Sequence, residues 1–130
     1  MPKVNVVVIS HSDKIVAGIV DLISQVKQPD VHIFPAGGTD DGGIGTSVEK
    51  ITSAIYQAHT EAGVLLLYDL GSASMNAEVA MEMYPDSLLE MADAPIVEGA
   101  YVAAVESGLG RTLREVKEAV ESTNRMNQSE

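Results

Sequence analysis

His11 is the residue in this chain whose type and position are best suited to covalent chemistry. It follows the apolar run Val6–Ile9, which is typical of a buried parallel strand, and Ser12 after it is a good N-cap for a helix. The carboxyl ends of such strands form the edge where open α/β sheets bind ligands. Helix N–H groups at that edge can hold an anion, so His11 could accept and pass on a phosphoryl group. From position alone, His11 could also be an ordinary polar residue of a strand–helix loop.

Asp69 directly follows a second buried run, Val64–Tyr68, and is the natural partner to orient His11. In a phosphohistidine site one ring nitrogen attacks, and an acceptor must hold the other nitrogen because it fixes the tautomer. The alternative interpretation of Asp69 is a carboxylate in a turn or at a helix start. Backbone N–H and hydroxyl groups that could surround the phosphoryl oxygens come from four residues: Gly38, Thr39, Gly71 and Ser72.

The spacing of the other polar residues does not support other site chemistries. The loop Gly37–Gly45 lacks the lysine of a Walker P-loop, and no GxSxG elbow indicates a hydrolase. The three histidines are far apart in sequence and there is no Cys, so no metal site is expected. Asp40 and Asp41 are interpreted as solvated turn residues rather than Mg²⁺ ligands. His32 and His59 are interpreted as structural or surface residues.

The composition limits the classes of function. The chain has 130 residues, enough for one domain over residues 1–130, with a polar tail expected from about residue 124. With 45% hydrophobic residues, no Trp and no Cys, the core must be aliphatic, and the six Met are assigned to it. A net charge of −11 argues against nucleic acid and anionic membranes as partners and suits a basic protein partner. No apolar run approaches the ~18 residues of a membrane span, so we expect a soluble, cytoplasmic protein.

Alternating apolar patterns predict a three-layer α/β sandwich with a mainly parallel central sheet. Thr46 and Glu49 match a capping box at the start of one helix, and Met75, Val79 and Met83 form the apolar stripe of the next. The loops that carry His11 and Asp69 then meet at one edge of the sheet. Strands are expected at Val4–Ile9, Val31–Phe34, Val64–Tyr68 and Ser87–Met91, and the first and last two helices at Ser12–Lys27, Ile96–Ser107 and Thr112–Thr123.

Four segments in the same order resemble one protein family over about residues 4–123. They are VISHS with His11, AGGTDDGGIGTS (Ala36–Ser47), LLLYDLGSASMNAE (Leu65–Glu78) and APIVEGAYVAA (Ala94–Ala104). The family is the phosphotransferase subunit of bacterial phosphoenolpyruvate (PEP)-dependent dihydroxyacetone kinases. That subunit is itself similar to the enzyme IIA domain of mannose-type sugar phosphotransferase systems (PTS), so the resemblance implies a mannose-type enzyme IIA-like fold.

The resemblance also implies a role for each site residue. His11 would become a tele-phosphohistidine by taking phosphate from the phosphocarrier HPr, with Asp69 as its orienting carboxylate. The phosphate-surrounding loops of the family fall on Gly38–Thr39 and Gly71–Ser72. The phosphate would pass to ADP on a separate nucleotide-binding subunit, and the ATP formed would phosphorylate dihydroxyacetone on a third subunit. No cofactor is expected on this subunit, because ADP and ATP are carried by its partner, and a homodimer is implied.

Two other functions stay open at this point. A mannose-type transporter IIA domain would hand its phosphate to a IIB partner, although the GGTDD loop and the APIVEGA segment argue against this interpretation. A phosphate-sensing regulatory module would use His11 as a switch without any onward kinase. The three loops contain no Arg or Lys, which suits a relay because phosphate held too tightly would not leave.

Overall fold

Strands and helices alternate along the chain, as the apolar pattern predicts. The structure is a computed structural model, and it describes residues 2–124. The elements are β1 (Asn5–Ser10), α1 (Asp13–Ser24), β2 (Ile33–Gly37), α2 (Val48–Ala58), β3 (Val64–Tyr68), α3 (Gly71–Met81), β4 (Leu89–Ala92), α4 (Ile96–Gly108) and α5 (Leu113–Glu121).

The described strands form one sheet in the order β2-β1-β3-β4, and each neighbouring pair is parallel. The register aligns the carboxyl ends of the three strands that precede the predicted site loops. Ser10 at the end of β1 pairs with Gly37 of β2, and Ile9 pairs with Tyr68 of β3. The residues that follow these strands therefore begin at one level of the sheet edge.

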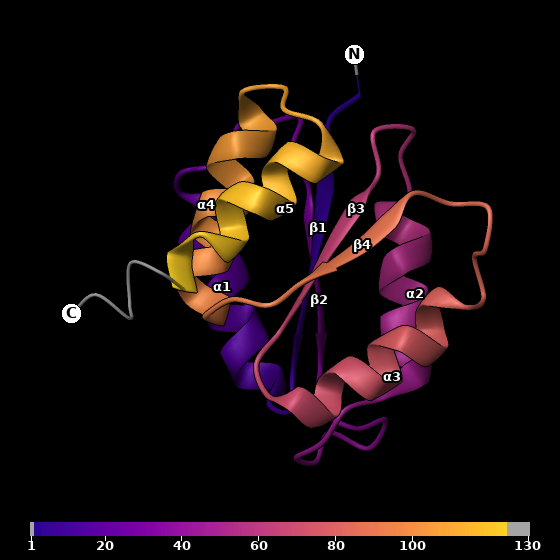
Figure 1. The fold of residues 1–130 in the computed structure, drawn as a ribbon. Coiled ribbons are helices and arrows are strands. Elements are labelled where there is room, and N and C mark those ends of the chain that lie inside the picture. The colour runs from indigo at the N-terminus through magenta and orange to yellow at the C-terminus, as the bar shows by residue number, and fades with distance from the viewer. Residues whose placement is uncertain (1, 125–130) are drawn as a thin grey trace.

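Helices cover both faces of the sheet, which makes three layers. Figure 1 shows α1, α4 and α5 over one face and α2 and α3 over the other. One buried apolar cluster joins the sheet to the first group of helices and a second cluster joins it to α2 and α3. The predicted α/β sandwich with a mainly parallel sheet is confirmed.

The apolar stripe predicted for α3 is wrong. Met75 and Met83 are 69% and 65% exposed, and Val79 is exposed as well, so these methionines are not core residues. This helix lies against β3 and α2 through small side chains, which allow a close approach of the backbones. The buried face consists of three alanines: Ala73, Ala77 and Ala80.

The start of α2 and the end of β2 differ from the prediction. The N-cap of α2 is Ser47, whose side chain accepts from the Lys50 N–H, so the capping box expected at Thr46 is wrong. Strand β2 was expected to end at Phe34, but it continues through Pro35 to Gly37. An edge strand tolerates proline, which has no N–H.

The C-terminal region adds a capping box that the sequence analysis did not identify. Thr112 caps α5, and Thr112 and Glu115 exchange side-chain and backbone hydrogen bonds. Asn124, the first residue of the expected polar tail, donates from Nδ2 to the Asp93 carbonyl over 2.6 Å. The remainder of that tail, residues 125–130, lies outside the described residues.

Candidate functional site

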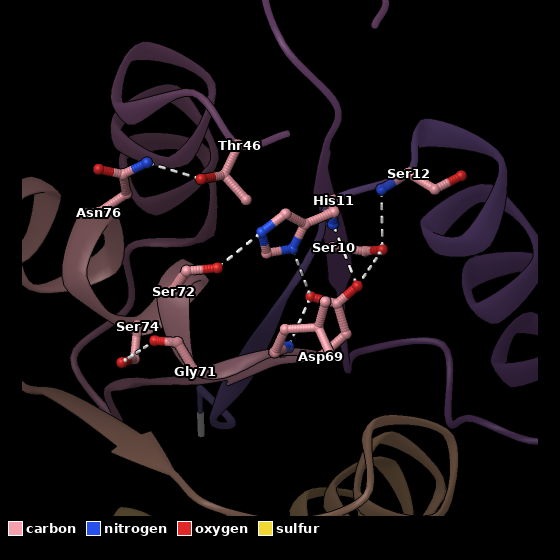
Figure 2. Close-up of polar contacts among 10 residues, drawn as sticks. Ser10, His11, Ser12, Thr46, Asp69, Gly71, Ser72, Ser74 and Asn76 are labelled. Carbon is pink, nitrogen blue, oxygen red and sulfur yellow. Dashed lines mark hydrogen bonds and ion pairs between the residues drawn. The ribbon is translucent and has the colours of Figure 1, made fainter. Parts of the chain in front are cut away.

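The His11 imidazole is held at one ring nitrogen by Asp69, which follows β3, and at the other by Ser72 in the first turn of α3. His11 directly follows β1, and its side chain is 21% exposed. Its Nδ1 lies 3.1 Å from Asp69 Oδ1, and its Nε2 lies 2.8 Å from Ser72 Oγ. Figure 2 shows the ring between these two residues. The structure thus brings together three of the residues predicted from the sequence.

The hydrogen bonds define which nitrogen of His11 can act as a nucleophile. An ionised carboxylate can only accept, so Asp69 requires the ring proton on Nδ1. Nε2 then carries the lone pair, and it accepts a hydrogen bond from the Ser72 hydroxyl. The nitrogen available for attack is therefore Nε2, beside the start of α3.

Asp69 accepts hydrogen bonds at both of its oxygens. Oδ1 receives Nδ1 of His11 and the Leu70 N–H, while Oδ2 receives the Ser10 hydroxyl and the His11 N–H. Burial opposes ionisation, but these hydrogen bonds outweigh burial and hold the pKa of Asp69 below its ordinary value. The side chain is 15% exposed, so the carboxylate is a fixed negative charge beside the imidazole.

Ser10 is a functional residue that the sequence analysis missed. Its buried hydroxyl donates to Asp69 Oδ2 over 2.7 Å and accepts from the Ser12 N–H over 3.0 Å. Ser10 therefore connects the orienting carboxylate to the start of α1. The available clue was a hydroxyl residue directly after the apolar run Val6–Ile9 and next to His11.

The glycine-rich loop before α2 is tied to the His11 backbone. The Gly38 N–H donates to the Ser10 carbonyl, and the Gly45 N–H donates to the His11 carbonyl over 2.8 Å. Gly38 has a φ of +74°, a conformation that side chains other than hydrogen disfavour. The Thr39 hydroxyl donates to Asp41 and accepts from the Gly43 N–H, so its hydrogen bonds remain inside the loop.

The first turn of α3 supplies backbone donors beside Nε2. Gly71 and Ser72 are its first two residues, and N–H groups at such positions have no acceptor within the helix. The N-cap residue, Leu70, has no side chain that could accept from them. An oxyanion near Nε2 would find these N–H groups and the favourable end of the helix dipole.

The lysine in the first turn of α2 binds the backbone of β2. Lys50 on α2 donates from Nζ to the Gly37 carbonyl over 2.9 Å and so secures the end of β2. Within residues 2–124, no group of three His, Cys, Asp or Glu side chains is placed to hold a metal ion. No helix in the same range is long and apolar enough to cross a membrane.

Comparisons with known proteins extend this description. Residues 5–117 match the EIIA-man family, described as "PTS system fructose IIA component". The chain is 44% identical over 101 residues to "PEP-dependent dihydroxyacetone kinase 1, phosphoryl donor subunit DhaM" of Listeria innocua, covering 78% of this chain and 79% of that protein. It is 35% identical over 116 residues to "PTS-dependent dihydroxyacetone kinase, phosphotransferase subunit DhaM" of Lactococcus lactis, covering 89% and 92%. The solved structure of "unknown function protein EF1359" is similar with a TM-score of 0.81 and 30% identity, covering 92% and 94%.

Proposed function

The chain belongs to the EIIA-man family of PTS IIA components, and on this premise we propose that it is the phosphoryl donor subunit of a PEP-dependent dihydroxyacetone kinase. His11 takes a phosphoryl group from HPr and passes it to ADP on the nucleotide-binding subunit. The ATP formed there phosphorylates dihydroxyacetone on the third subunit. The observation that carries the proposal is the His11 ring, with Nδ1 held by Asp69 and Nε2 next to Ser72 and the first turn of α3.

The proposed transfer uses the lone pair of His11 Nε2. A bond forms from Nε2 to phosphorus while the bond from phosphorus to the leaving atom of the donor breaks. The ring gains positive charge, which the Asp69 carboxylate at Nδ1 stabilises. In the second transfer the Nε2–phosphorus bond breaks as a terminal oxygen of ADP forms a bond to phosphorus. The proton on Nδ1 stays in place throughout.

The surroundings of His11 support protein partners rather than a small substrate. Ile44 in the glycine-rich loop is 80% exposed, and Leu70 and Met75 at the start of α3 are exposed as well. Large apolar side chains exposed at the site end of the molecule are typical of a docking surface. Asp13 and Asp40 add exposed acidic groups there, which suits a basic phosphocarrier. HPr and the nucleotide-binding subunit would dock in turn over this end, in the cytoplasm.

A homodimer is part of the proposal, and the face formed by α1 and α4 is its interface. These neighbouring helices and the residues just after them expose seven large apolar side chains, and those of α4 and its C-cap recur every four residues. Lys14 and Glu98 are exposed in the first turns of the two helices, and these opposite charges suit contact between α1 of one copy and α4 of the other. The apolar residues are Ile15, Leu22, Val26, Val97, Tyr101, Val105 and Leu109.

The test is phosphorylation in a reconstituted relay. The protein is incubated with labelled PEP, enzyme I and HPr, and acid-labile phosphate on the chain is measured. His11→Ala should take up no phosphate and keep its fold, whereas the control His32→Ala, at an exposed residue, should behave as the wild type. Adding the nucleotide-binding subunit with ADP should then remove the phosphate from the chain. A IIB transporter domain added in its place should not remove the phosphate faster. Phosphate uptake by His11→Ala would refute the assignment.

A further inference from the structure

A second hydroxyl group next to His11 is held by a side-chain hydrogen bond between the two halves of the site. Asn76 of α3 donates from Nδ2 to Thr46 Oγ1 over 2.6 Å, and both side chains are partly buried. The bond joins residues that are 30 positions apart in the sequence. Neither residue was identified from the sequence as part of the site.

Both ends of this hydrogen bond are anchored close to the imidazole. Thr46 follows Gly45, whose N–H donates to the His11 carbonyl. Asn76 lies four residues after Ser72 on α3, so the two side chains share one face of the helix. In Figure 2, Thr46 and Ser72 both lie on the side of the His11 ring that carries Nε2, and Asn76 lies on the far side of Thr46 from the ring. The Thr46 side chain thus lies on the side of the ring to which a phosphoryl group on Nε2 would be attached.

The chemistry of the amide decides how the Thr46 hydroxyl is used. An amide NH₂ only donates, so Asn76 occupies a lone pair of the Thr46 oxygen and leaves the hydroxyl proton for another acceptor. Within the described residues, no protein acceptor takes that proton. Ser72 Oγ, in contrast, already donates to Nε2. The site therefore contains one hydroxyl committed to the nitrogen and one whose proton is available.

We propose that Thr46 is a phosphate-binding residue of this site and that Asn76 is its positioning residue. This inference rests on the proposed function of His11. When Nε2 carries a phosphoryl group, the Thr46 hydroxyl donates to one of its oxygens, alongside the backbone N–H groups of Gly71 and Ser72. Asn76 keeps the Thr46 hydroxyl in the donor role, and an acceptor at position 76 would take its proton instead.

The experiment compares Thr46→Val and Asn76→Asp with the wild type in the reconstituted relay. Hydrogen bonds to charged groups support a loss of about 10- to 100-fold in the phosphorylation rate for each variant. Thr46→Ser retains the hydroxyl and should remain close to the wild-type rate. Thr52→Val is the matched control, because the Thr52 hydroxyl on α2 donates to the Val48 carbonyl and not toward His11.

A second readout separates binding of the phosphoryl group from a structural role. A donor to the phosphoryl oxygens favours their dianion, so loss of the Thr46 donor should raise the phosphoryl pKa, measured by ³¹P NMR titration of the phosphorylated protein. Thr46→Val and Asn76→Asp should shift this pKa upward together, and Thr52→Val should not. Slower transfer with an unchanged phosphoryl pKa would overturn the inference, as would wild-type rates in both variants. If the wild type takes up no phosphate, the proposed function fails. If His11→Ala loses activity while Thr46→Val and Asn76→Asp keep it, the proposed function stands and only the role of Thr46 is refuted.

Discussion

At the residue scale, the Asp69 carboxylate accepts hydrogen bonds from four donors. Two hydrogen bonds reach each oxygen, from Ser10, Leu70 and two groups of His11. A side chain at this position must therefore accept with both of its terminal atoms. An amide cannot do this, since its NH₂ would face two donors whichever way it turned.

Asp69→Asn should consequently slow phosphate uptake more than its similar shape suggests. The amide disrupts the bond that places the proton on Nδ1 and removes the charge that stabilises the imidazole during transfer. Partners of this kind support losses of roughly 10²–10⁴-fold. Single-turnover rates with phosphorylated HPr measure the effect, and an Asp69→Asn rate within a factor of two of the wild type would contradict it.

The stability of the protein in acid should also depend on Asp69. Its folded-state pKa lies below the ordinary 3.8, so its contribution is present above that pH and is lost as the pH falls through the folded-state pKa. We expect the difference in melting temperature between wild type and Asp69→Asn to be largest near neutral pH. This difference in melting temperature should become smaller as the pH is lowered from about 4 to the lowest pH at which both variants fold. A gap that stays constant with pH would show that the charge of Asp69 does not stabilise the fold.

The sequence was sufficient to identify His11, Asp69 and Ser72 as neighbours, because each follows the end of a recognisable strand at one sheet edge. It was insufficient for Ser10, Thr46 and Asn76. Their roles depend on rotamers and on the packing of α3 against the loop before α2, which no spacing along the chain encodes. Thr39 and Thr46 lie in the same loop, and only the structure distinguishes the hydroxyl bound within it from the one facing α3.

At the scale of elements, the close approach of α1 to β2 fixes the backbone on which His11 depends. A Cβ at Gly37 would lie 2.4 Å from Val16 Cγ2 and 2.9 Å from backbone atoms of Asp13 and Ser12. Real side chains do not reach such distances, so α1 or β2 would have to move. The helix that starts beside His11 therefore requires glycine at the end of β2.

Gly37→Ala should destabilise the protein by about 1–3 kcal/mol, as over-packing does. Gly18→Ala is the matched control on α1, because a Cβ there meets nothing within 4 Å. Alanine is favoured over glycine inside a helix, so this variant should gain about 0.5–1 kcal/mol. Urea unfolding measures both changes. Equal effects of the two substitutions would contradict the steric argument.

Element boundaries were predictable where local chemistry sets them and unpredictable where packing does. The limits of β3 follow from the glycine before it and the Asp-containing turn after it, and the prediction of Val64–Tyr68 is confirmed. In α3 the pattern Met75, Val79 and Met83 indicated the wrong face, since alanines make the close contact with the sheet. The spacing of apolar residues shows which of them share one face of a helix. It does not show which face is buried when the opposite face carries small apolar residues such as alanine.

At the scale of the whole molecule, the net charge of −11 disfavours a free nucleotide. The site loops contain no Arg or Lys, and Lys50 is engaged with the Gly37 carbonyl. Isothermal titration of the isolated protein with Mg-ATP should therefore detect no binding in the micromolar range. The nucleotide-binding subunit is the positive control, since in the proposed relay it is the subunit that carries the nucleotide. Micromolar binding by the isolated protein would point to a self-contained kinase.

Self-association should depend on the face formed by α1 and α4. Val105→Glu introduces a charge at a residue of this face that is 41% exposed, and should shift the protein from dimer to its monomer mass of 13.7 kDa. Val79→Glu on α3, at a residue that is 49% exposed, is the matched control and should leave the dimer intact. Sedimentation equilibrium distinguishes the two. A monomeric wild type, or a dimer that persists in Val105→Glu, would refute this interface.

The contact between Ser72 and Nε2 has a consequence for how partners distinguish the empty from the loaded protein. The hydroxyl that donates to the bare nitrogen loses that acceptor once phosphorus is bound, and a turn about its χ1 redirects it to an oxygen. Such a rotation takes picoseconds to nanoseconds, far less than the lifetime of a protein encounter. This change of hydrogen-bond partner requires rotation of one side chain and no rearrangement of α3. In the proposed relay, HPr and the nucleotide-binding subunit would then distinguish the two states by the charge on His11 rather than by a change of backbone shape.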